Sequence, residues 1–272
     1  MTFSIVARSD DGESWGVAVA SKFLAVGSAV PAAVAQVGAI ATQAYANVAY
    51  KGLALSHLDE GATAEIALER LLEEDPGRAQ RQVGIVDVDG GAAAHTGAGC
   101  IGWAGHRTGA GYAIQGNCLA GEEVVAAMES TWLDGVALPF AERLLTALAA
   151  GDAAGGDKRG RQSAAMLVVR DEAGYDGMDD IAVDLRVDDH PDPLTELTRL
   201  LDLNDFYLSA PPEEDRVPID GALRAELEAF GAGTEPGDFA GWVGQENYEM
   251  RVDPALEWID RRVLAIVRGD RS

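Results

Sequence analysis

The segment TFSIVARSDDGESWGVAVAS, residues 2–21, decides the fold that the sequence predicts. Its two apolar runs, Thr2–Arg8 and Trp15–Ser21, flank the turn sequence Asp10-Asp11-Gly12, a pattern typical of a β-hairpin. Both runs are apolar at successive positions, which predicts strands covered on both faces. Because a tight hairpin pairs its strands antiparallel, we expect an antiparallel sheet buried on both sides.

A second hairpin follows the same rule. The runs Gln82–Val88 and Ala92–Thr96 flank the turn sequence Asp89-Gly90-Gly91. Further strands are expected at residues 39–43, 112–115, 164–170 and 181–187. Antiparallel strands buried on both faces are best satisfied by two sheets packed together, each with helices on its outer face.

Two pairs of helices supply that cover. The first pair is expected at residues 48–58 and 63–74, the second of these capped by Thr63. The other pair is expected at residues 121–133 and 138–150, each with one apolar face. The predicted fold class is therefore α+β, a four-layer α-β-β-α sandwich of two antiparallel sheets.

The C-terminal part has a different organisation. A helix is expected from Asp192-Pro193 to about Ser209, and the proline-rich run that follows indicates a linker. Later helices are expected at residues 220–230 and from Asp253-Pro254 onward. The predicted domains are a sandwich at 1–210, a linker at 211–216 and a short helical tail at 217–272. Such a short tail can form only a marginal core of its own, so we expect it to pack on the sandwich.

Charge and composition exclude several classes of partner. The chain has 45 acidic against 21 basic residues, a net charge of −24 that would repel nucleic acids and anionic lipids. We therefore expect no nucleic-acid or membrane partner and a salt-adapted, halophilic protein; an acidic patch for a cationic ligand is the alternative. With no long apolar stretch or signal peptide, the chain is expected to be cytoplasmic. Cys100 and Cys118 indicate a reducing compartment, although one disulfide is an alternative.

Two motif-like patterns carry little weight. The run GAGCIG, residues 97–102, matches a dinucleotide-binding pattern, but the residues after it begin no helix, so a tight loop is expected. Zinc could bind the donors His95, Cys100, His106 and Cys118, yet their spacing matches no zinc signature. We expect neither a metal nor a cofactor.

The start of the chain points to a possible nucleophile. Met1 precedes the small residue Thr2, which is the usual condition for removal of an initiator methionine. Thr2 would then carry a free α-amine, which can act as the base for its own hydroxyl. The alternative is an ordinary protein that happens to begin Met-Thr.

Five segments resemble an uncharacterised prokaryotic family, the domain-of-unknown-function family numbered one thousand and twenty-eight. They are WGVAVASKFLAVGSAVP, GAIATQAYAN, RQVGIVDVDG, GYAIQGN and GRQSAAMLVVRD. The family is placed among the N-terminal nucleophile (Ntn) hydrolases, so the resemblance, over roughly Thr2–Ser209, implies an Ntn-type sandwich. From about Val217 the chain is similar to an accessory segment of some members that is labelled a peptidoglycan-binding module.

The resemblance to proteasome-type relatives implies catalytic roles for Thr2, Ser21, Lys22, Asn117, Asp157 and Ser163. Thr2 falls at the nucleophile, whereas Ser21 replaces the acid that normally orients a lysine, leaving Lys22 as the nearest cation. Backbone N–H groups near Thr42–Ala46 would form the oxyanion hole. Substrate binding is therefore assigned to Thr42 and Gln43. Separately, His106 and Arg107 could bind an anionic substrate group, with an ordinary surface loop as the alternative. Each of these residues also has an ordinary structural interpretation.

Three functions follow as hypotheses, and whether the protein is an enzyme stays open. The first is hydrolysis of an amide bond through a Thr2 acyl-enzyme, with a small peptide or acylamino compound as substrate. The second is a catalytically silent Ntn-fold protein that binds a peptide or cell-wall fragment. The third is a structural component of an oligomer, and a homo-oligomer is expected in any case.

Overall fold

The computed structural model describes residues 2–269, so Met1 and residues 270–272 lie outside the description. The chain divides into two compact units, Met1–Thr198 and Arg199–Ser272. This division falls within helix α6, Pro193–Leu208, which begins at Pro193 as the sequence predicts. The two units are described in turn.

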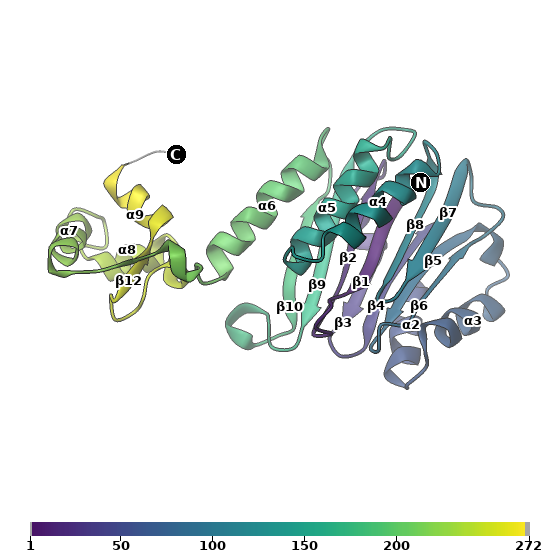
Figure 1. Cartoon of the computed structure of the whole chain (residues 1–272), viewed down its shortest axis with the longest axis horizontal. Helices are drawn as coiled ribbons and strands as arrows, with labels where there is room; N and C mark the ends of the chain where they lie inside the picture. The colour runs from purple at the N-terminus through teal and green to yellow at the C-terminus, as the bar shows by residue number, and fades with distance from the viewer. Residues whose placement is uncertain (1, 270–272) are drawn as a thin grey trace. The chain divides into compact units, whose positions relative to one another are not determined.

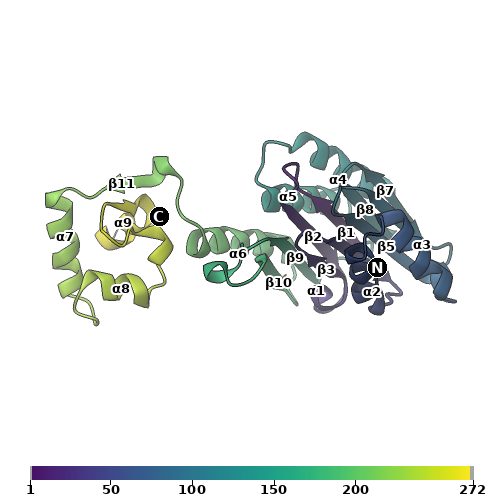
Figure 2. The same ribbon diagram turned by 90° about the horizontal axis from the view of Figure 1, so that it is seen from below.

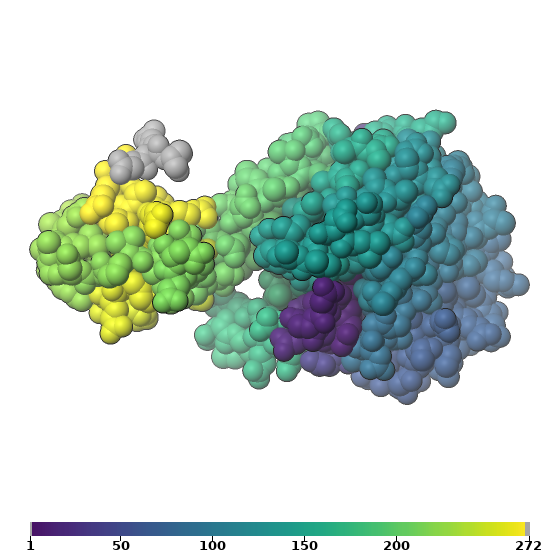
Figure 3. Space-filling model, in the orientation of Figure 1, coloured from purple at the N-terminus to yellow at the C-terminus, as the bar shows by residue number. Residues whose placement is uncertain are grey.

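The N-terminal hairpin is confirmed. Strand β1, Thr2–Arg8, pairs antiparallel with β2, Ser14–Ser21, in a register that places Thr2 opposite Ser21. The turn between them closes at Gly12, whose φ of 78° favours glycine. Figure 3 shows this turn at the surface, in dark purple below the teal helices, while almost all of the two strands is buried.

The larger sheet has six strands in the order β10-β9-β2-β1-β8-β7, and neighbouring strands are antiparallel. Its other strands are β7 (Trp103–Gly109), β8 (Tyr112–Leu119), β9 (Ser163–Arg170) and β10 (Ile181–Val187). Strand β1 therefore lies inside the sheet, between β2 and β8. The smaller sheet has the order β3-β4-β5-β6, also antiparallel, with β3 (Pro31–Val34), β4 (Gly38–Ala44), β5 (Arg81–Asp87) and β6 (Ala92–Thr96).

Helices cover one face of each sheet. Helices α4 (Glu123–Asp134) and α5 (Phe140–Ala153) contact the larger sheet, and α2 (Ala49–Asp59) and α3 (Ala64–Glu74) contact the smaller one. Figures 1 and 2 show α4 and α5 on one side of the strands and α2 on the other. The side chain of Thr63 accepts a hydrogen bond from Ile66 N, which confirms the predicted cap of α3. A short helix, α1 (Val26–Ala29), follows β2.

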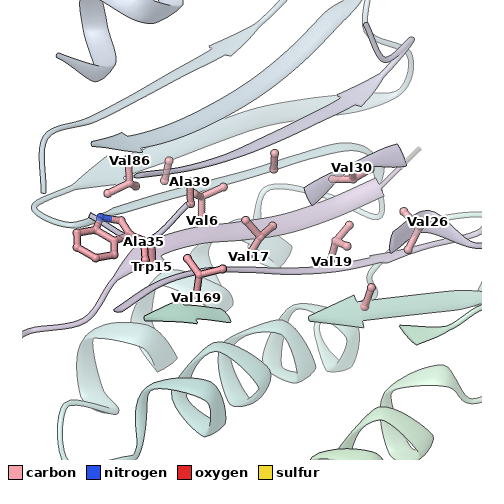
Figure 4. Packing of buried hydrophobic residues seen from close by; sticks show 13 residues of the cluster. Val6, Trp15, Val17, Val19, Val26, Val30, Ala35, Ala39, Val86 and Val169 are labelled. Atoms are coloured by element: carbon pink, nitrogen blue, oxygen red, sulfur yellow. The ribbon is translucent and has the colours of Figure 1, made fainter. Parts of the chain in front are cut away.

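The two sheets contact each other through an apolar layer. Buried side chains of both sheets, including Val6, Trp15, Val17 and Val86, form one cluster between them (Figure 4). Burying a side chain of this size contributes roughly 1.5–3 kcal/mol each relative to exposure. This layer therefore explains why the hairpin strands are apolar at successive positions, since helices cover their other face.

One strand of this unit was not predicted from the sequence. Residues 103–109, which follow the run GAGCIG, form strand β7 at an edge of the larger sheet. Its residues are intermediate or exposed, so it lacks the apolar run that identifies the central strands. The expected loop does hold for residues 97–102, where Gly102 has a φ of 67°.

The second unit has its own apolar core. It contains β11 (Arg216–Pro218), α7 (Gly221–Ala232), α8 (Phe239–Gln245), β12 (Trp258–Asp260) and α9 (Arg261–Arg268). Phe206, Leu227, Trp242, Ile259 and other buried residues pack together there. This unit also contains short 3₁₀ turns at Glu213–Asp215 and Glu249–Arg251, and the first unit contains two more, at Arg78–Gln80 and Tyr175–Gly177.

The predicted last helix begins later than expected. Asp253 does not cap a helix; its carboxylate accepts hydrogen bonds from Ala255 N and Glu257 N and so closes a turn. The helix starts only after Asp260, whose side chain accepts from Arg262 N.

None of the helices within residues 2–269 combines the length and apolar character needed to cross a bilayer.

Candidate active site

The layer between the sheets changes from apolar to polar along the same strands. On β1 the inward positions run from Val6 through Ser4 to Thr2, and on β8 the residues opposite them are Ala113, Gln115 and Asn117. Five polar residues at this end, which we call the amide cluster, are each at most 1% exposed: Ser4, Gln43, Gln82, Gln115 and Asn117.

Hydrogen bonds join the amide cluster across both sheets. Ser4 Oγ donates to Gln43 Oε1 at 2.7 Å and accepts from Gln115 Nε2 at 2.7 Å. Gln43 Nε2 and Asn117 Nδ2 both donate to Gln82 Oε1, at 2.8 and 2.9 Å. Buried amides are tolerated when they are paired in this way, and the pairing fixes the orientation of every member.

Gly84 makes room for one member of the cluster. A Cβ at this position would lie 2.0 Å from Gln115 Oε1, so a larger residue would displace the Gln115 amide. That oxygen is buried and has no hydrogen-bond partner among the described residues. Only glycine therefore fits at position 84 without moving the Gln115 amide, and a single added methyl group would disturb the cluster.

Thr2 lies at the edge of the amide cluster. Its Oγ1 is 3.0 Å from Ser21 Oγ, and both residues are buried. The Thr2 carbonyl oxygen accepts hydrogen bonds from Gln43 Nε2 at 3.2 Å and from Asn117 Nδ2 at 3.4 Å. The structure thus brings together four of the residues expected at the site, Thr2, Ser21, Asn117 and Gln43.

The side chains of Lys22 and Asp157 bond to groups other than Thr2. Lys22 Nζ donates to Arg161 O at 3.3 Å. The Asp157 carboxylate accepts from Lys22 N at 2.9 Å and forms an ion pair with Arg159, also at 2.9 Å. Asp157 therefore fixes the backbone just after β2 and neutralises an arginine, while the Lys22 ammonium bonds to a loop carbonyl.

Ser163 also holds the segment after β2. It lies opposite Ser21 in the β2–β9 ladder, and its Oγ donates to Phe23 O and accepts from Val26 N at 3.1 Å. Ser21, Asp157 and Ser163 line a small cavity of about 10 Å³, close to the space that one water molecule needs. Ser21, Asp157 and Ser163 are therefore close to one another, but backbone contacts and this cavity relate them.

The segment expected to form an oxyanion hole already uses two of its N–H groups. Thr42 N donates to Val30 O and Tyr45 N to Gln80 O, both at 3.2 Å. Thr42 Oγ1 donates to Asn47 O at 3.3 Å. An oxyanion hole here would have to use other N–H groups of the segment.

His106 and Arg107 lie on β7 and have opposite environments. His106 Nδ1 lies 2.9 Å from Thr96 Oγ1, which also accepts from Gln82 Nε2 at 2.9 Å, so His106 connects to the amide cluster. Partial burial, and next the nearby His95, lower the pKa of His106. Arg107 pairs with the carboxylates of Glu129 at 2.7 Å and Glu122 at 3.0 Å, so binding an anion there would require these pairs to open.

Ser4, Gln82 and Gln115 were not among the residues expected from the sequence. The signal that could have found them is a single glutamine or serine in each of three otherwise apolar runs, TFSIVAR, RQVGIVD and YAIQG. Within residues 2–269, no group of three His, Cys, Asp or Glu side chains is arranged to hold a metal. Cys100 and Cys118 are free thiols.

Comparisons with known proteins give one family. No curated protein matches the chain. A protein from Silicibacter pomeroyi, whose crystal structure is assigned to the family model DUF1028, is 33% identical with a TM-score of 0.68, over 75% of this chain and 89% of that one. The model described as "Family of unknown function (DUF1028)" matches residues 2–197. The chain therefore belongs to this family.

Proposed function

We propose that the protein is an N-terminal nucleophile amidohydrolase that cleaves an amide bond through an acyl-enzyme on Thr2. The proposal includes the four-layer Ntn arrangement of the first unit. Two antiparallel sheets in contact, with helices on the outer face of each, support that arrangement. Membership of the DUF1028 family is compatible with it and assigns no activity.

The observation that carries the proposal is the placement of the Thr2 hydroxyl. Thr2 begins an interior strand, its Oγ1 lies 3.0 Å from Ser21 Oγ, and two amides hold its carbonyl oxygen. This fixes the residue in one orientation at the end of the sheet. A nucleophile needs such preorganisation, because small displacements from the attacking geometry cost large factors in rate.

The reaction would use the α-amine of Thr2 once Met1 is removed. The amine takes the hydroxyl proton as Oγ1 attacks the substrate carbonyl carbon, and the tetrahedral intermediate expels the amine product, which takes that proton. Water then hydrolyses the ester and restores the Thr2 hydroxyl. Because Lys22 Nζ bonds to Arg161 O, the α-amine, with an ordinary pKa of about 7.7–8.0, is the proposed base. Activity should rise as pH passes through that range.

Mass spectrometry and active-site labelling test the proposal. The native protein should lack the mass of Met1 and should be acylated by a β-lactone at Thr2. Thr2→Ala should abolish this labelling, whereas Thr146→Ala, an exposed threonine on α5, should label like the wild type. Retention of Met1, or equal labelling of wild type and Thr2→Ala, would reject the nucleophile.

A catalytically silent binding protein is the second candidate. The observation that favours it is that Lys22 and Asp157, the charged groups expected around Thr2, bond to Arg161 and Arg159 instead. This alternative predicts no lactone labelling under any condition together with measurable binding of a peptide or cell-wall fragment. Those two results together separate it from the hydrolase.

For residues 217–272 we keep peptidoglycan binding as a proposal that rests on sequence resemblance. Co-sedimentation of the full chain with insoluble peptidoglycan, compared with a chain that ends after Ser209, tests it. Equal sedimentation of the two chains would reject a binding role for this segment.

A further inference from the structure

A groove of about 900 Å³ runs beside the edge strand β6, and its lining includes neither Thr2 nor Ser21. The lining comes from one face of α3, from Arg78, from Ala92–His95 of β6, and from His106 and Thr108 of β7. Successive residues of a strand point to opposite faces of the sheet. A groove that touches four successive residues therefore follows the edge of β6.

The free edge of β6 offers unpaired backbone groups to this groove. Within residues 2–269, β6 pairs only with β5. The bonds Asp87 N to Gly91 O and Gly97 N to Arg81 O show that the odd-numbered residues of this ladder bond to β5. By the alternation of antiparallel ladders, the N–H and C=O groups of Ala92, Ala94 and Thr96 point away from β5. They are placed to accept one more strand.

Helix α3 forms the side of the groove that faces this edge, and it contributes both acidic and apolar side chains. Glu65, Glu69 and Glu73 recur every fourth residue of α3, so they share one face of the helix, and all three are exposed. Leu68 and Leu72 line the groove beside them. A lysine or arginine fits this combination, because its methylene stem can cover the leucines while its charge reaches a carboxylate.

The basic residues that line the groove do not neutralise its three glutamates. Arg78 is the one lining residue with a fixed positive charge, and its carbonyl oxygen bonds to His95 Nε2 at 2.9 Å. Partial burial, and next the nearby His95, lower the pKa of His106, which disfavours its positive charge. Three carboxylates thus face one fixed cation.

We propose that this groove binds an extended, lysine- or arginine-containing peptide segment, which adds to β6 as a further antiparallel or parallel strand. Main-chain hydrogen bonds to Ala92, Ala94 and Thr96 provide the pairing, and alternate side chains facing α3 provide selectivity for cations. A second copy of the chain fits less well, since pairing of two β6 edges would bring two sets of glutamates together. The proposal does not depend on the chemistry of Thr2.

Fluorescence anisotropy with the full chain and a fluorescein-labelled Val-Lys repeat octapeptide tests the proposal. The matched Val-Glu peptide should bind at least tenfold more weakly. N-methylation of alternate residues should weaken binding at least tenfold in one register and less than twofold in the other. If both registers behave alike, or if neither peptide binds, strand addition is rejected.

Variants separate the groove from the general negative charge of the protein. Glu69→Gln with Glu73→Gln should weaken binding at least fivefold. The control, Glu123→Gln with Glu142→Gln, changes the net charge equally on exposed positions of α4 and α5 and should change binding less than twofold. Equal losses in both variants would mean diffuse attraction and would overturn the proposal.

The backbone is tested with Ala92→Pro. Proline removes the outward N–H at the first residue of an edge strand, a position where it is tolerated, so the thermal midpoint should hold while peptide binding falls at least threefold. Unchanged binding by a folded variant would contradict the proposal. Sedimentation analysis of the free protein completes the test, because a dimer abolished by Ala92→Pro would identify a second copy as the occupant.

Discussion

The two ends of the layer between the sheets are built from the same strands and behave differently. At one end, Val6, Trp15 and Val86 pack as apolar side chains. At the other end, the same strands place Ser4 and Gln82 in the amide cluster, at most 1% exposed. Both ends are equally buried, so burial alone does not explain why one of them is polar.

The difference shows what each end contributes. An apolar contact contributes in proportion to the area it removes from water, and a similar side chain can replace it at small cost. A buried hydrogen bond contributes only about 1 kcal/mol net, while an orphaned partner costs about 1–3 kcal/mol. The amide cluster therefore adds little stability that an apolar core would not supply. What it does fix is the orientation of the Thr2 carbonyl, through Gln43 and Asn117.

The largest effect is expected at the apolar end, from Trp15→Ala. Trp15 is fully buried and its Nε1 donates to Asp87 O at 3.2 Å. Large-to-small changes of this kind cost about 3–5 kcal/mol, which lowers the thermal midpoint of this unit on the order of 10 °C. Calorimetry measures it, with Trp15→Phe as the control that should lose less than half as much. A loss below about 1 kcal/mol would show that the apolar end is not the main source of stability.

A smaller loss is expected at the polar end, from Gln82→Leu. This substitution keeps the approximate volume but leaves Gln43 Nε2 and Asn117 Nδ2 without their shared acceptor, at a cost of about 2 kcal/mol. Lactone labelling of Thr2 should fall together with stability. Gln80→Leu, at an exposed position, is the matched control and should alter neither quantity. If Gln82→Leu is stable and still labelled, the cluster does not position Thr2.

Much of the fold could be predicted because its signals are local. Turn residues next to apolar runs predicted both hairpins, and Thr63 predicted the start of α3. Strand β7 was missed because an edge strand is only half covered and has no apolar run. The late start of α9 was missed because Asp253 and Asp260 are both good caps, and tertiary packing decides which one begins a helix.

The site was less accessible from the sequence. Thr2 was identified from the start of the chain and from the resemblance, and Ser21 and Asn117 from the resemblance alone. The strand registers place both Ser21 and Asn117 opposite Thr2. The partners of Lys22 and Asp157 could not be predicted, because a charged side chain near a loop can reach many carbonyl or guanidinium groups within a few ångströms. Arg159 and Arg161 take these roles here.

Ser21→Ala should have a smaller effect on stability than either change above. It removes one hydroxyl from the Thr2 pair and creates little empty volume, so the expected loss is about 1 kcal/mol or less. The labelling rate of Thr2 should nevertheless fall several-fold, because the Oγ1 loses the neighbour that orients it. Ser28→Ala, a serine on α1, is the control for both measurements. Unchanged labelling in Ser21→Ala would remove Ser21 from the site.

The smallest effect concerns salt, and it tests whether the two ends differ only through neutral interactions. With a net charge of −24, the folded chain repels itself, and the repulsion falls as the Debye length shrinks from about 10 Å at 0.1 M to about 3 Å at 1 M. The thermal midpoint should therefore rise with KCl. None of Trp15, Gln82 or Ser21 carries a charge, so each variant should rise in parallel with the wild type, and the free-energy differences between them should stay within about 0.5 kcal/mol. Calorimetry across this range measures both trends. A flat or falling thermal midpoint would reject salt adaptation. If the free-energy difference from the wild type disappears at high salt for Gln82→Leu alone, the amide cluster responds to the charge around it.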